Sequence, residues 1–183
     1  HQAYATVGNA KQFPVTAKVG RQELLYGDER LIGPSDWSNT GRVFDGAKLR
    51  FENSSFWVDA FAARVVVPVD GEFNESDHHD WLFGAYASSK TLVPVQESQL
   101  YFLSRNVGVG SSAGSAPRDV YSIGARIKSL PGKLKAWDYS LELVQQLGSV
   151  SQDKVRREQQ AFATSVGGGY TFKKGPLVVT PLV

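Results

Sequence analysis

Residues 20–50 read GRQELLYGDERLIGPSDWSNTGRVFDGAKLR, and the interpretation of the whole chain depends on this stretch. Charged residues and glycines are scattered through it without helical periodicity, and it lies between two runs in which apolar and polar residues alternate. A link of this length inside a folded protein is either functional or disordered, and its Leu, Ile, Tyr and Trp residues favour an ordered segment. We therefore expect an ordered, functional link between two strands.

The composition predicts a folded, β-rich protein. The 183 residues are 42% hydrophobic, enough for a sizeable core, and they include 18 Gly and no Cys. The absence of Cys excludes disulfides and thiolate metal sites. A net charge of +2 without long basic runs does not favour a nucleic-acid partner, and no apolar run is long enough for a transmembrane helix.

Alternation of apolar and polar residues predicts an all-β fold, since helical periodicity is almost absent. Expected strands cover residues 15–22, 46–52, 56–67, 80–88, 98–105, 120–128, 134–147 and 159–172, with weaker ones at 4–9 and 177–183. Within the strand at 120–128, Tyr121, Ile123 and Ile127 point to one face. Arg126 and Lys128 point to the other.

Short and long links alternate along the chain, with 23–45, 68–79, 106–119 and 148–158 as the long ones. In an antiparallel up-and-down meander, this alternation puts all short turns at one end, as in outer-membrane barrels. Aromatic residues near both ends, such as Trp81 and Trp137, fit interfacial girdles.

We therefore predict a transmembrane β-barrel or a partial segment of one, with residues 1–183 as a single, incomplete barrel domain of about 8–10 strands. A soluble sandwich or a closed ligand-binding barrel remains the alternative. In two strands, simple alternation puts charged side chains on the apolar face: Arg64 in one, and Arg21 and Glu23 in the other. A β-bulge, or emergence of the strand into the headgroup layer, would explain both cases.

Three segments carry a resemblance to a known family. The run Gly20–Arg30, the run Trp37-Ser-Asn-Thr-Gly-Arg42 and the Phe44-Asp-Gly46 that enters the next strand resemble the signature region of the alginate export family. The resemblance implies a bacterial outer-membrane barrel in contact with lipid, of roughly eighteen strands in a full-length member, with an external link folded into a charged pore. The chain would be about half of such a member. A partner in the periplasmic export machinery is left open.

In this interpretation, fixed cations along the pore bind the carboxylates of an acidic polysaccharide one after another as the polymer moves. Nearby acidic residues keep the binding of the polymer weak, as conduction requires. The alternative is that these charges pair across strands and fill a polar interior. The candidate pore-lining residues are Arg21, Arg30, Arg42, Lys48, Arg50, Arg105, Arg126, Lys128, Asp138 and Glu142.

No group of residues predicts an enzyme. The two His of Asp77-His78-His79-Asp80 point to opposite faces of an extended chain, so we expect no metal site, and no cofactor is implied. Asp138 and Glu142 lie ~13 Å apart along a strand, too far for a glycosidase pair. We expect an outer-membrane channel for an alginate-like polyuronate or another acidic solute. The alternatives are a soluble or surface barrel that binds acidic glycans without transport, and a general porin.

Overall fold

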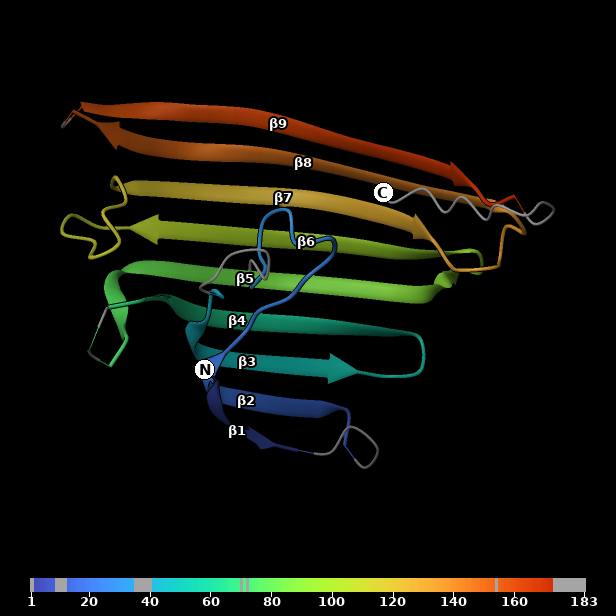
Figure 1. Cartoon of the computed structure of the whole chain (residues 1–183), viewed down its shortest axis with the longest axis horizontal. Coiled ribbons are helices and arrows are strands. Elements are labelled where there is room, and N and C mark those ends of the chain that lie inside the picture. The colour runs from blue at the N-terminus through green and yellow to red at the C-terminus, as the bar shows by residue number, and fades with distance from the viewer. Residues whose placement is uncertain are drawn as a thin grey trace.

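The structure is a computed structural model that describes residues 2–8, 13–34, 41–69, 71, 73–153 and 155–172. Nine strands form one antiparallel sheet in which each strand pairs with the next in the chain (Figure 1). The strands are β1 (Ala3–Val7), β2 (Val15–Gln22), β3 (Phe44–Glu52), β4 (Phe56–Val67), β5 (Glu75–Val93), β6 (Gln96–Val107), β7 (Arg118–Ser129), β8 (Trp137–Gln152) and β9 (Val155–Tyr170).

The predicted all-β, up-and-down antiparallel meander is confirmed. Within the described residues the sheet is open, with β1 and β9 as its edges, so closure into a single barrel domain stays a prediction. The described part of the chain contains no helix long and apolar enough to cross a membrane. The expected strand at residues 177–183 lies outside the described residues.

Several strands are longer than predicted, and one expected link is wrong. β8 and β9 pair from Trp137 opposite Tyr170 to Gln152 opposite Val155, so only residues 153–154 join them instead of a long link at 148–158. Ser149, Ser151 and their neighbours read as a loop because they are polar. A hydrogen-bonded strand pair satisfies its backbone wherever it lies, however, so polar side chains do not end it.

The two faces of the sheet differ because residues 23–34 lie against only one of them. This segment follows β2, and Figure 1 shows its trace in front of the middle strands. We call the face beneath it the covered face and the other the open face. The core lies between the segment and the covered face, and consists of Leu24, Tyr26, Ile32, Phe44, Phe61, Ala63, Leu82, Tyr86, Tyr101 and Leu103.

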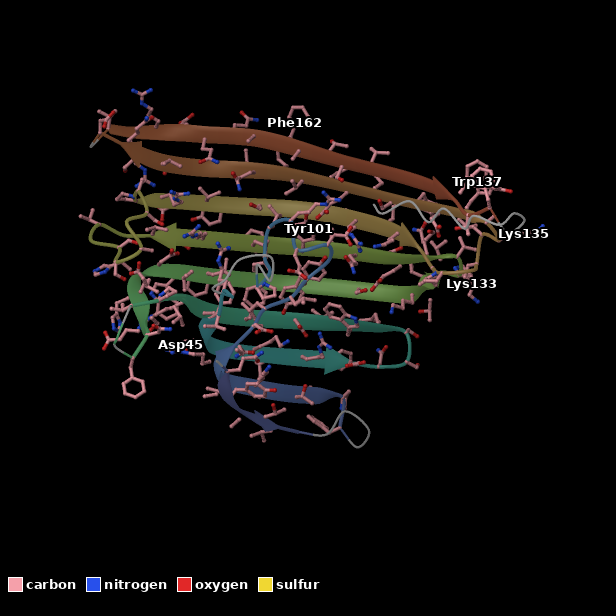
Figure 2. The ribbon with its side chains drawn as sticks, viewed as in Figure 1. Asp45, Tyr101, Lys133, Lys135, Trp137 and Phe162 are labelled. Carbon is pink, nitrogen blue, oxygen red and sulfur yellow. The ribbon has the colours of Figure 1, made fainter. Side chains whose placement is uncertain are left out.

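The open face carries a broad apolar band. Directly opposite residues on neighbouring strands share a face, so the register aligns Ala85, Phe102 and Ile123 in one row across β5, β6 and β7. Exposed apolar side chains of this face include Leu49, Leu100, Phe102, Ile123, Leu143, Phe162 and Val166. Figure 2 shows Phe162 near the middle of β9 and Trp137 beside the β7–β8 link.

Gln145 is a polar side chain within this band. Gln145 of β8 lies opposite Ile123 and Phe162 on the open face. Its Nε2 donates a hydrogen bond to the Ala161 carbonyl at 2.9 Å, which satisfies one donor of the amide within the sheet.

Two glycines allow aromatic rings of the covered face to lie flat on the sheet. A Cβ placed at Gly84 would lie 2.2 Å from the Phe61 ring, and one placed at Gly124 would lie 2.2 Å from the Tyr101 ring. Real Cβ atoms do not approach other atoms so closely. Both positions therefore need glycine for the rings to pack as they do.

Candidate functional site

Tyr26 anchors the 23–34 segment to the covered face. Its ring stacks on Tyr86 with centroids 4.6 Å apart and on Phe61 with centroids 5.4 Å apart. Its hydroxyl donates to Asp59 Oδ2 at 2.8 Å. Burial raises the pKa of Tyr26 far above its ordinary value, and the nearby Asp59 carboxylate raises it further, so the hydroxyl stays protonated and acts as a donor.

Asp28, two residues further on, places a carboxylate between two of the predicted cations. Its Oδ1 lies 2.5 Å from Arg126 Nη2 and 3.3 Å from Lys128 Nζ. Burial alone would raise the Asp28 pKa, but the hydrogen bonds and charges of Arg126 and Lys128 outweigh it and hold that pKa below its ordinary value. Asp28 is therefore ionised at neutral pH.

Asp59 of β4 is the centre of a second ion-pair group. It is fully buried and lies directly opposite Arg50 of β3. The Arg50 guanidinium donates to both carboxylate oxygens, from Nε at 2.6 Å and from Nη2 at 2.9 Å, and Lys48 Nζ lies 3.4 Å away. This fork arrangement is the geometry in which arginine binds carboxylates most strongly.

Two further predicted pore-lining residues form an ion pair between the segment and the sheet: Arg30 of the segment and Glu142 of β8. Arg30 Nε lies 3.3 Å from Glu142 Oε2, and the other Glu142 oxygen accepts a hydrogen bond from the Tyr101 hydroxyl at 2.7 Å. Arg105 is paired separately, with its Nε and Nη2 at 3.0 and 2.5 Å from the two oxygens of Asp80.

Cavities lie on both sides of the segment. One of about 550 Å³ contains Asp28, Arg30, Lys128 and Asp138 in its lining. Another of about 180 Å³ has Leu31 and Ile32 on the segment side and Arg105 among the strand residues. Between them only about 10 Å³ remains where the segment meets Tyr86, Tyr101 and Glu142. The segment thus separates two hollows of the covered face.

The structure brings eight of the ten predicted pore-lining residues to this face or to the segment against it, and places Arg42 and Arg21 elsewhere. Lys48, Arg50, Arg105, Arg126, Lys128 and Glu142 take part in the ion pairs above, Arg30 belongs to the segment, and Asp138 lines the larger cavity. Arg42 is exposed in the link before β3.

The predicted position of Arg21 in the pore lining is wrong. Its partner in the register, Asp45, lies opposite Arg64 on the open face, so Arg21 does not line the covered face. The reason is the strict alternation along β2, which puts Arg21 on the same side as Val19 and Ala17. The same alternation places Arg64 on the open face, and a register shift follows it between Arg64 and Val66.

The sequence analysis does not single out Tyr26 or Asp28 as site residues. Both lie in a link without periodicity, and their partners are distant in sequence, with Asp28 and Arg126 98 residues apart. The one available signal was the mixture of charged and aromatic residues in an otherwise irregular segment. Such a mixture indicates an ordered link but does not indicate its contacts.

An antiparallel meander with a charged, aromatic-rich face and an opposite apolar face is compatible with a segment of an outer-membrane β-barrel. The sequence matches the family described as Alginate export over residues 1–178, and the protein belongs to this family, which is a family of outer-membrane transport proteins. The predicted resemblance is thereby confirmed. A comparison with curated proteins found no match.

Proposed function

We propose that the protein forms part of a channel in the bacterial outer membrane that passes an acidic polysaccharide, an alginate-like polyuronate, along the covered face. The observation that carries the proposal is the position of Asp28 between Arg126 and Lys128. A uronate residue presents the same functional group, a carboxylate. The segment therefore already shows how two cations, two residues apart on the same face of β7, hold such a group.

In the proposed mechanism, polymer carboxylates exchange with the protein's own carboxylates. A uronate that enters the larger cavity competes with Asp28 for Arg126 and Lys128, and with Glu142 for Arg30. Because each cation has an internal partner, net binding of the polymer stays weak, and weak binding at several sites allows conduction. The narrow contact between the segment and the tyrosines would be the constriction.

The same ion pairs are also compatible with a purely structural polar interior, in which the cations and carboxylates of neighbouring strands neutralise each other. The two cavities and the segment between them favour a pathway, because a purely structural interior has no need of hollows lined by charged groups. A general porin would share the barrel but would not distinguish a polyuronate from a neutral glycan of the same length.

Single-channel recording in planar bilayers tests the proposal, with the full-length protein that contains this chain. Oligomannuronate should block the current in a concentration-dependent way, and an uncharged oligosaccharide of equal length should not. Replacement of Arg126 and Lys128 together by Gln should weaken the block about tenfold or more, as expected for the loss of two charge-assisted contacts. Lys133→Gln, an exposed change in the β7–β8 link, is the matched control.

Equal block by the charged and the neutral oligosaccharide would favour the general porin. Unchanged block in the double variant would remove Arg126 and Lys128 from the pathway. A protein that inserts into no bilayer but binds oligomannuronate in solution would support the alternative of a glycan-binding barrel.

A further inference from the structure

Arg64 of β4 is a cation on the open face that has no carboxylate partner within the described part of the chain. It lies directly opposite Asp45 of β3 and Trp81 of β5. Asp45 is already bound by Arg21, whose Nε and Nη2 lie 2.8 and 2.7 Å from its two oxygens. Among the residues that the structure describes, no carboxylate oxygen lies within 4.0 Å of the Arg64 guanidinium.

The surroundings of Arg64 hold its guanidinium in place without neutralising it. Its Nη1 lies 2.7 Å from His78 Nδ1, and the guanidinium carbon lies 4.2 Å from the centroid of the Trp81 ring. Its Nε is buried and has no hydrogen-bond partner. Because arginine can only donate, His78 Nδ1 is the acceptor, and the neutral ring then carries its hydrogen on Nε2 as a further donor.

The position of Arg64 is at the border of the apolar band. Towards the middle of β4 the same face carries Ala62, Ala60 and Val58, and beyond Arg64 the strand shifts register. If the band faces lipid, as the proposed function requires, Arg64 lies at the level of the headgroups, where Trp side chains such as Trp81 are favoured.

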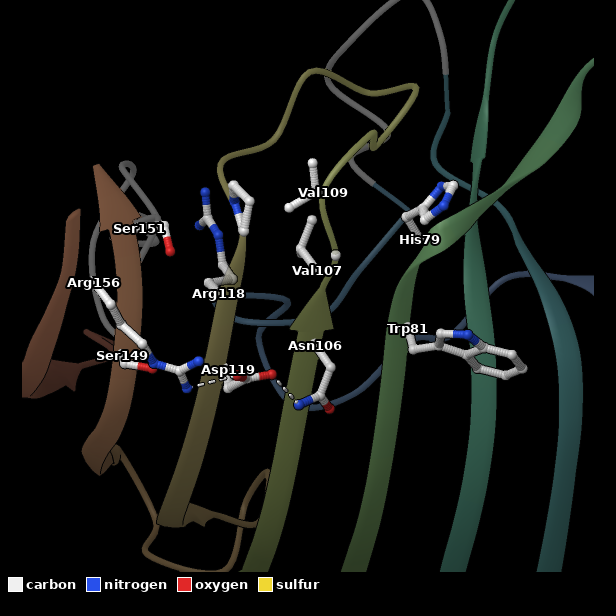
Figure 3. A pocket seen from close by; sticks show the side chains of 12 residues that line it. His79, Trp81, Asn106, Val107, Val109, Arg118, Asp119, Ser149, Ser151 and Arg156 are labelled. Carbon is white, nitrogen blue, oxygen red and sulfur yellow. Dashed lines mark hydrogen bonds and ion pairs between the residues drawn. The ribbon is translucent and has the colours of Figure 1, made fainter. Parts of the chain in front are cut away.

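A neighbouring cavity at the same end of the sheet contains an arginine, Arg156, whose charge is neutralised by a carboxylate of the protein. Asp119 accepts hydrogen bonds from Arg156 Nη2 at 2.8 Å and from Asn106 Nδ2 at 2.9 Å (Figure 3). Arg156 thus has its counter-charge within the protein. Arg64 has no such counter-charge among the residues that the structure describes, and it is the better candidate to bind an anion from outside.

We propose that Arg64 and His78, backed by Trp81, bind the phosphate group of a membrane lipid headgroup at this rim of the sheet. The inference rests on the proposed membrane function. A phosphate accepts two hydrogen bonds from one guanidinium and could take a third from His78 Nε2, so it matches the free donors in number and charge. A phosphorylated glycolipid or a phospholipid would supply it.

The test is native mass spectrometry of the full-length protein, titrated with a bisphosphorylated glycolipid and with the same lipid after enzymatic dephosphorylation. The wild type should retain the phosphorylated form preferentially. Arg64→Gln should lower that retention roughly fivefold, the size expected for one basic residue at an anionic surface. Arg64→Lys should restore part of it, and His78→Ala should lower it less than Arg64→Gln.

Arg156→Gln is the matched control, because that arginine is exposed on the same face but already paired, and it should change nothing. Equal retention of both lipids, equal losses in the Arg64 and Arg156 variants, or displacement of the lipid by inorganic phosphate alone would overturn the lipid assignment. Insertion and conductance are recorded in parallel with each variant. A protein that conducts normally but retains phosphorylated and dephosphorylated lipid equally contradicts this inference only. A protein that does not insert into the bilayer contradicts the proposed function.

Discussion

Asp28 is the residue on which the proposed pathway depends most. Removing its charge in Asp28→Asn leaves Arg126 and Lys128 without their internal partner. Oligomannuronate should then block at a concentration about fivefold lower, equivalent to the ~1 kcal/mol of a partly exposed ion pair. The measurement is the half-blocking concentration in single-channel recordings.

Asp153→Asn is the control for this change, because Asp153 lies in the β8–β9 turn and its backbone φ of 51° is one that Asn adopts readily. An Asp28→Asn channel with the half-blocking concentration of the wild type would show that this carboxylate does not compete with the polymer.

The same residue predicts a pH dependence. The pKa of Asp28 is lowered in the folded protein, so its ion pairs contribute stability above the ordinary Asp pKa of ~4, and this contribution is lost as the pH falls through the lowered value. The 23–34 segment should therefore loosen, and chloride conductance should rise, only on acidification below about pH 4. Conductance measured from pH 7 to pH 3 checks this. The Asp28→Asn channel should show the raised conductance throughout, and a wild type that stays constant over the whole range would contradict the assignment.

At the scale of the strands, glycine sets how closely the aromatic core lies on the sheet. Gly124→Ala would place a methyl group 2.2 Å from the Tyr101 ring, so the ring must move and the contact with Glu142 is lost. We expect a cost of about 1–3 kcal/mol, typical of overpacking. Urea unfolding of the protein in lipid vesicles measures it.

Gly168→Ala serves as the matched strand variant, because the nearest atom to its added Cβ is the Asp138 carbonyl oxygen at 3.9 Å. It should unfold at the urea concentration of the wild type. Equal effects of the two changes would mean that the loss comes from strand glycines in general and not from the Tyr101 contact.

At the scale of the whole molecule, we expect the two faces of the sheet to differ in how well they tolerate an added charge. Phe162 is 80% exposed on the open face, and Phe162→Arg should cost ~2–4 kcal/mol if that face meets the middle of a bilayer. Ala163→Arg, one residue further on β9, puts the same charge on the covered face and should be tolerated. Unfolding in lipid vesicles compares the two. Equal tolerance of both would contradict a lipid-facing band.

Much of the architecture follows from local pattern. Alternation in residues 120–128 placed Ile123 and Arg126 on opposite faces, and the structure agrees. The pattern failed where polarity and pairing disagree, since Ser149 and Glu158 are polar yet lie in a continuous strand pair. At Arg21 the alternation was right and the assignment was wrong: this residue was assigned to the pore because of its charge, although the alternation placed it on the other face.

The sequence by itself determined the all-β meander, the family and the face to which Lys48, Arg50, Arg126 and Lys128 belong, because these depend on a two-residue period and on motifs contiguous in the chain. Only the tertiary structure decided that the segment at 23–34 lies against the covered face, that Asp28 pairs with Arg126, and that Arg64 has no carboxylate partner among the described residues. Those contacts join residues far apart in sequence, and an irregular link carries no period from which its partners could be inferred.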